Sequence, residues 1–170
     1  MGVLALGASD CEALNGGWLG QPVNSLSSLA YVGAGAYVLR RGGPSAMPLA
    51  VALGAVGVGS VLYHGPMPPG AEAVHDGSIA ALAATIVLTA AVRRSLPRPP
   101  TVAVVTFGVA VAINLLTRTG APLCRPHSLL QGHAAWHVLT AVALAAWLGA
   151  RRPEVEGRSV RPGPGRRWRW

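Results

Sequence analysis

Residues 46–64 read AMPLAVALGAVGVGSVLYH, and this stretch decides the fold class. Up to residue 59 it carries no charge, whereas Ser60, Tyr63 and His64 close it with polar groups. An α-helix needs roughly 20 mostly apolar residues to cross the hydrocarbon core of a bilayer. We therefore expect a transmembrane helix that is apolar for most of its length and polar at its C-terminal end.

Four further apolar runs flank this one, at 24–39, 72–92, 101–117 and 129–150. The connectors between the runs are rich in Gly, Pro and Arg, which interrupt helices. Hydrophobic residues make up 51% of the chain and charged residues 12%, against about 25% charged in soluble domains. This composition excludes a disordered chain, and two cysteines exclude a disulfide-dense scaffold. We predict an all-α, polytopic transmembrane helix bundle of about five spans within residues 1–150, followed by a disordered, Arg-rich tail at 151–170.

The basic residues predict the orientation of the bundle. All 14 are arginines, and they cluster beside the apolar runs, a pattern typical of membrane topology rather than of nucleic-acid binding. All but Arg118 and Arg125 fall on the side that holds the first connector, the third connector and the tail. The positive-inside rule then places the N-terminus outside and the tail in the cytoplasm. We expect no signal peptide, since the N-terminal stretch has neither a basic region nor a clear cleavage site.

The lack of lysine beside abundant Ala, Gly, Pro and Arg is typical of a GC-rich bacterial genome. We therefore predict a multi-pass protein of the bacterial plasma membrane.

Polar residues gather at the outer ends of all five predicted spans. Ionisable groups at membrane depth are costly and usually mark function, so we expect these side chains to face one another. From the first span to the fifth they are Asn24, Ser25, Ser27 and Ser28; Ser60, Tyr63 and His64; Glu72, His75 and Asp76; Asn114 and Thr117; and His133 and His137.

The spacing of the histidines indicates a metal site. His133 and His137 are four residues apart, on one face of a helix, and such a pair can bind a single ion. With His64 they would give three imidazoles, and three imidazoles plus an open position describe a catalytic zinc site. Ser60 lies one turn before His64 and would face the same way. The sequence therefore predicts His64, His133 and His137 as zinc ligands.

A hydrolase built on this site needs a general base. Ala134 stands where the HExxH metalloprotease motif has its glutamate, so the base must come from another helix. Asp76 on the third span is our candidate. Its neighbour His75 would point roughly 100° away and lie at the rim of the site, and His127 would be solvated in the last loop.

Two other functions fit the same residues. Paired histidines on membrane helices can bind haem, which would make the protein an electron carrier but would leave Asp76 and Ser60 without a role. A non-enzymatic receptor or metal-binding module could use the three histidines with Asp76 as a fourth ligand. Each histidine alone could also be a hydrogen-bonded packing residue.

Three segments resemble the alkaline ceramidase family, which belongs to a wider group of membrane hydrolases that includes the adiponectin-receptor-like proteins. They are SVLYH at 60–64, HD at 75–76 and GHAAWH at 132–137. CEALN at 11–15 and QPVNSLSSLAY at 21–31 also resemble the start of the first ceramidase helix. The resemblance implies zinc held by the three histidines, with Asp76 and Ser60 assisting hydrolysis of a lipid amide such as ceramide, to a sphingoid base and a fatty acid.

The resemblance also implies a lipid substrate taken from the membrane, and it indicates no nucleic acid or protein partner. The chain departs from the family at two points. The family has seven spans where we count five. Gln21 also stands where the animal ceramidases have an acidic residue linked with calcium, so calcium at Asp10, Glu12 and Asn15 is less well supported than zinc.

Cys11 and Cys124 both fall on the predicted outer side, where disulfides persist. A bridge would tie the N-terminal segment to the loop before the last span. Two unpaired thiols are the alternative, because a sequence does not give the separation of the Cα atoms.

Overall fold

A computed structural model describes residues 7–93 and 96–150 of the chain. Over these ranges the protein is helical and has no strand, which confirms the all-α prediction. The predicted disordered tail lies outside the described residues. In chain order, the elements are α1 (Pro22–Ser27), α2 (Leu29–Gly42), the 3₁₀ helix η1 (Gly43–Ala46), α3 (Met47–His64), α4 (Ala71–Arg93), α5 (Thr101–Thr117) and α6 (Gly132–Leu148).

The five apolar runs of the sequence coincide with these helices. Proline starts several of them: Pro22 opens α1 and Pro48 lies in the first turn of α3, where the missing N–H costs no helical hydrogen bond. Ser28 keeps helical dihedral angles between α1 and α2, so the two form one nearly continuous helix. Gly43 ends α2 with a φ of 62°, a left-handed conformation that glycine adopts without steric cost.

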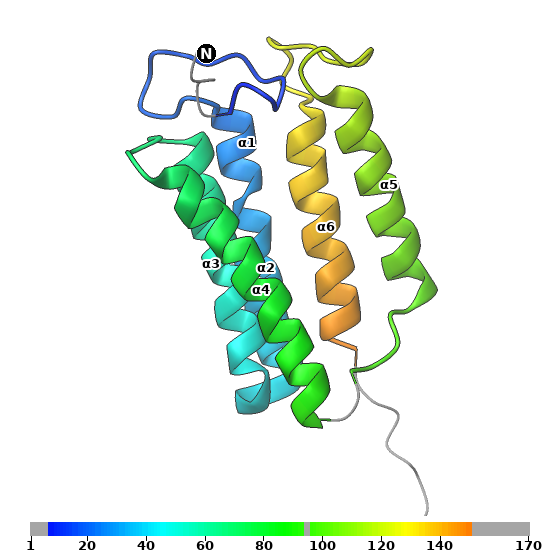
Figure 1. The fold of residues 1–170 in the computed structure, drawn as a ribbon. Coiled ribbons are helices and arrows are strands. Elements are labelled where there is room, and N and C mark those ends of the chain that lie inside the picture. The colour runs from blue at the N-terminus through cyan, green and yellow to red at the C-terminus, as the bar shows by residue number, and fades with distance from the viewer. Residues whose placement is uncertain (1–6, 94–95, 151–170) are drawn as a thin grey trace, which may run out of the picture.

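Two helical stretches, Pro22–His64 and Ala71–Val92, are long and apolar enough to cross a membrane. The first comprises α1 to α3, and the chain reverses within it at η1 (Figure 1). Helices α5 and α6 are apolar but have 17 residues each. The number of spans and their orientation therefore stay predictions.

Small residues let α3 approach its neighbours closely. A Cβ atom at Gly57 would lie 2.7 Å from Val32 of α2, and one at Gly59 would lie 3.0 Å from Ser78 of α4. Close backbone contact through such residues is typical of helices that pack in membranes. The apolar core beside these contacts consists of Tyr31, Ala34, Val38, Ala46, Leu49, Ala52, Leu53, Val56, Leu82 and Ala141.

The helices differ in how many neighbours they contact. Helix α6 packs against α1 and α2 on one side and α5 on the other, whereas α4 packs mainly on α3 (Figure 1). The end of α3 and the starts of α4 and α6 lie at one end of the bundle, together with the end of α5 (Figure 1). The fold thus brings the polar ends of the predicted spans to one level.

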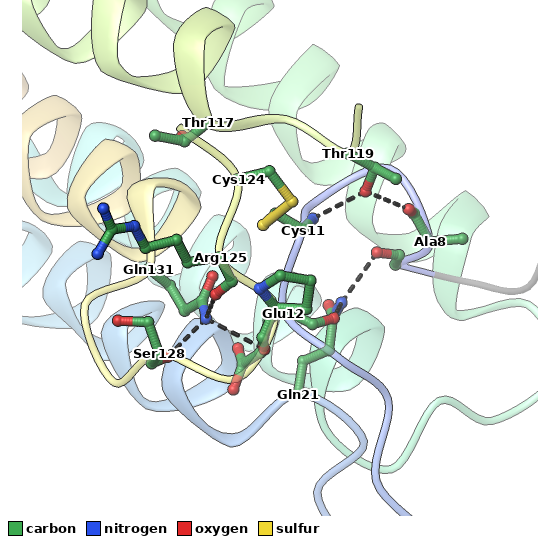
Figure 2. Close-up of a disulfide and its surroundings, with 12 residues drawn as sticks. Ala8, Cys11, Glu12, Gln21, Thr117, Thr119, Cys124, Arg125, Ser128 and Gln131 are labelled. Atoms are coloured by element: carbon green, nitrogen blue, oxygen red, sulfur yellow. Dashed lines mark hydrogen bonds between the residues drawn. A yellow bond between two sulfur atoms is a disulfide. The ribbon is translucent and has the colours of Figure 1, made fainter. Parts of the chain in front are cut away.

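The N-terminal segment, residues 7–21, covers this end. Figure 2 shows the disulfide that joins Cys11 to Cys124 in the α5–α6 loop. The Cα atoms of the two cysteines lie 5.6 Å apart. This disulfide confirms the predicted bridge and excludes the alternative of two unpaired thiols. Thr119 adds two hydrogen bonds beside it: its Oγ1 accepts from Cys11 N and donates to Ala8 O.

Candidate metal centre

His64, His133 and His137 converge at the covered end of the bundle. His64 is the last residue of α3, and the other two lie one turn apart at the start of α6. One ring nitrogen from each lies within 4.8 Å of the others. Over residues 7–93 and 96–150, this three-histidine cluster is the only group of three or more His, Cys, Asp or Glu side chains so arranged. The structure therefore brings together all three residues that the sequence predicted as ligands.

Gln21 fixes the proton of His64. The Nε2 of Gln21 donates to the carbonyl oxygens of Gly7 and Glu12, so its Oε1 must face the imidazole. His64 Nδ1 lies 2.7 Å from that oxygen and donates to it. In the neutral ring the lone pair is then on Nε2, the nitrogen free to bind a metal.

The other two histidines are held in the same way. His137 Nδ1 lies 3.2 Å from the carbonyl oxygen of Asn24, which can only accept a hydrogen bond. His133 Nδ1 lies 3.2 Å from Asn114 Oδ1 and 3.5 Å from Asp10 Oδ1. Metal-binding histidines in proteins typically donate their second nitrogen to a carbonyl or carboxylate oxygen in this manner.

The Nε2 atoms of His64 and His133 are buried and have no hydrogen-bond partner in the structure. An unsatisfied buried polar atom is unfavourable, and two of them in one cluster need an explanation. A cation bound between the rings would satisfy both lone pairs. The cluster therefore fits a metal ion, and three imidazoles suit zinc, copper, iron or nickel.

Ser60 and Asn24 lie on the helices that border the cluster. Ser60 is 1% exposed and stands one turn before His64 on α3, as its spacing predicted. Asn24 is fully buried, and neither its Oδ1 nor its Nδ2 has a hydrogen-bond partner. The sequence placed Asn24 at the polar level but gave it no role.

Asp76 lies apart from the cluster. Its side chain is 69% exposed, and Oδ1 accepts a hydrogen bond from His75 Nδ1 at 2.8 Å. The ring of His75 stacks on Tyr63, and its centroid lies 6.2 Å from that of His64. Asp76 is thus linked to the cluster through His75, the residue that the sequence predicted at the rim of the site.

The side chains considered for calcium make other contacts. The two carboxylate oxygens of Glu12 accept from the backbone N–H groups of Val23 and Asn24 in the first turn of α1. Asn15 Oδ1 accepts from Gly17 N, and Asp10 Oδ1 accepts from Ser9 Oγ. Burial raises the pKa of the Asp10 carboxyl, although the Ser9 hydrogen bond and Arg118 act in the opposite direction.

Sequence reasoning missed the roles of Gln21, Asn114 and Asp10 as partners of the histidines. One signal could have found Asp10. It precedes Cys11, and the predicted bridge to Cys124 would bring it near the start of the last span, where His133 lies. No comparable signal connects Gln21 with His64.

Comparison with known proteins adds no relative: no family model, curated protein or solved structure matches the chain.

Proposed function

We propose that the protein is an integral membrane, zinc-dependent hydrolase of a lipid amide bond, similar to the alkaline ceramidases. The observation that carries this proposal is the three-histidine cluster, in which two buried Nε2 atoms lack partners while every Nδ1 has an oxygen partner. In this proposal all five apolar runs cross the membrane, with the N-terminus outside and the tail in the cytoplasm. The cluster then lies on the outer side of the membrane, beneath the N-terminal segment.

A zinc ion bound by His64, His133 and His137 supplies a Lewis acid for the amide carbonyl and makes water nucleophilic near neutral pH. The protein's own groups handle the protons. Asp76, acting with its hydrogen-bonded partner His75, takes a proton from the attacking water and returns it to the leaving amine. The C–N bond breaks, and a fatty acid and an amine leave.

Ser60 has a different role in this proposal. Its hydroxyl lies one turn from His64 and donates a hydrogen bond to the oxyanion that develops on the carbonyl. An apolar groove of about 370 Å³ beside the start of α6, which Ser27, Leu130 and Val138 help to line, offers room for an acyl chain.

A second function, a non-enzymatic metal-binding module, is favoured by one observation. Asp76 is mostly exposed and does not belong to the cluster, so three ligands are in place without an adjacent carboxylate base. The haem alternative has less support, since the ring centroids of the three histidines lie 4.5 to 5.2 Å apart, a spacing that suits one ion between them.

Metal analysis of the purified full-length protein, followed by a hydrolysis panel of ceramides and other lipid amides, tests the proposal. We expect one zinc per chain and release of fatty acid from at least one amide, with no release by zinc-free His137→Ala. Zinc-loaded protein that hydrolyses none of the amides would leave the metal-binding module as the better account.

A further inference from the structure

The N-terminal segment supplies partners to two of the three histidines. Asp10 lies beside Nδ1 of His133, and Gln21 accepts the proton of His64. The segment also orients Gln21 itself, because the carbonyl oxygens of Gly7 and Glu12 bind its amide nitrogen. The metal centre is therefore assembled from the helices and from a covering segment outside them.

One covalent bond ties this segment to the α5–α6 loop. The disulfide joins Cys11, which stands between Asp10 and Glu12 in the chain, to Cys124 (Figure 2). Hydrogen bonds also join the segment to this loop: Ala13 N donates to Pro126 O at 2.9 Å, and Thr119 bonds with Ala8, Ser9 and Cys11 through its backbone N–H and its hydroxyl. Loss of the covalent tie would leave these exchangeable hydrogen bonds to hold Asp10 in place.

The backbone at Cys11 is held in an unfavourable conformation. Its φ is 68°, in the left-handed region that residues other than glycine rarely adopt. Such a conformation persists only where the surrounding structure enforces it. Once the disulfide is opened, Cys11 is free to return to an ordinary φ, and the adjacent Asp10 would move with it.

We propose that the Cys11–Cys124 disulfide is a redox switch that sets the metal affinity of the three-histidine cluster. A dithiol reductant supplies two electrons and two protons, the S–S bond becomes two thiols, and the reductant is oxidised to its own disulfide. Cys11 is 6% exposed and Cys124 is part-exposed, so the incoming thiolate attacks the sulfur of Cys124. This inference depends on the metal site of the proposed function but not on hydrolysis.

The size of the effect follows from the partners that are released. Loss of a hydrogen-bonding partner behind a metal-binding histidine typically weakens metal affinity by about 10- to 100-fold. Reduction loosens Asp10, which lies 3.5 Å from His133 Nδ1, while Asn114 of α5 stays as the hydrogen-bond partner of that atom. It also loosens Gly7 and Glu12, whose carbonyl oxygens orient Gln21 toward His64. We expect the zinc dissociation constant to rise by about this factor.

The test measures zinc affinity of the full-length protein in detergent, by competition with a chromophoric chelator. A phosphine reductant opens the disulfide, since added thiols would compete for zinc, and thiol labelling verifies reduction. The double variant Cys11→Ser/Cys124→Ser should bind zinc as weakly as the reduced wild type, and the reductant should not change its affinity. With the disulfide intact, Asp10→Asn should also weaken zinc binding.

The outcomes separate this inference from the proposed function. Weaker zinc binding in both the reduced wild type and the double variant, with unchanged helical circular dichroism, supports the switch even if no lipid amide is hydrolysed. Affinities that stay within twofold of the oxidised protein overturn the switch and leave the hydrolase proposal intact. Oxidised wild type that binds no zinc overturns both.

Discussion

Helices α6 and α4 each carry residues that the sequence assigned to one site, yet the two helices differ in how deeply these residues are buried. Helix α6 lies between α1, α2 and α5, and its His137 is 2% exposed. Helix α4 packs mainly on α3, and the side chain of its Asp76 is 69% exposed. Residue type and spacing therefore identify candidate residues, whereas the number of helices packed around each candidate decides whether its side chain is buried at the centre of the bundle.

The largest effect should come from α6. His137→Ala removes one of three ligands and should leave the purified protein essentially free of zinc, because two imidazoles bind the ion far more weakly. Elemental analysis after gel filtration measures this. His127→Ala, in the exposed α5–α6 loop and outside the cluster, is the matched control and should retain one zinc per chain. Equal zinc in the two variants would mean that α6 does not bind the metal.

The corresponding change on α4 should spare the metal. Asp76→Asn keeps the shape of the side chain but removes the basic oxygen, so zinc should stay bound while hydrolysis of the lipid amide falls by roughly 10²- to 10⁴-fold. Glu72→Gln, one turn earlier on α4 and also exposed, is the control and should keep its activity. Loss of zinc from Asp76→Asn would instead identify the carboxylate as a fourth ligand and would erase the contrast between the two helices.

A smaller effect is expected from Gln21, the hydrogen-bond partner of His64 at the end of α3. Gln21→Ala leaves His64 Nδ1 without its acceptor and should weaken zinc binding by about 10- to 100-fold. The chelator competition assay measures the dissociation constant. Gln131→Ala, whose amide binds only backbone carbonyls of the α5–α6 loop, is the control. Equal affinities in the two variants would show that Gln21 does not position His64.

The smallest effect should lie on the outer face of α4. Leu88 is 63% exposed, so Leu88→Ala should change the free energy of unfolding by no more than about 0.5 kcal/mol. Leu53 of α3 is fully buried, and Leu53→Ala should cost about 2–5 kcal/mol. Thermal unfolding in detergent compares the two variants. A comparable loss in both would mean that α4 is packed more completely than its contacts with α3 indicate.

The clustering of His64, His133 and His137 could be predicted from the sequence, because two independent constraints agree on it. The spacing of His133 and His137 puts them on one helix face, and the end of the 46–64 run brings His64 to the same level. The boundaries of the helices also lie near the ends of the predicted runs, and the run 101–117 coincides with α5 at both ends. Helical periodicity and apolar length are local properties, and a sequence records them directly.

The hydrogen-bond and ion-pair partners of the three histidines could not be predicted in this way. Asp10 and Gln21 lie in a segment without helical periodicity, so their positions depend on tertiary contacts and on the disulfide. The exposure of the Asp76 side chain could not be predicted from its spacing for a related reason. Periodicity gives the direction of a side chain about its own helix axis, but the rotation of α4 against α3 is set by close contacts such as Gly59 with Ser78.

Zinc K-edge X-ray absorption of the zinc-loaded, full-length protein tests the central claim most directly. We predict three imidazole nitrogens at about 2.0–2.1 Å and one oxygen ligand, as in a site that keeps an open position. The same spectrum of His137→Ala, loaded with excess zinc, should lose one imidazole. A wild-type spectrum with fewer than three imidazoles, or one unchanged by His137→Ala, would contradict a metal centre built on His64, His133 and His137.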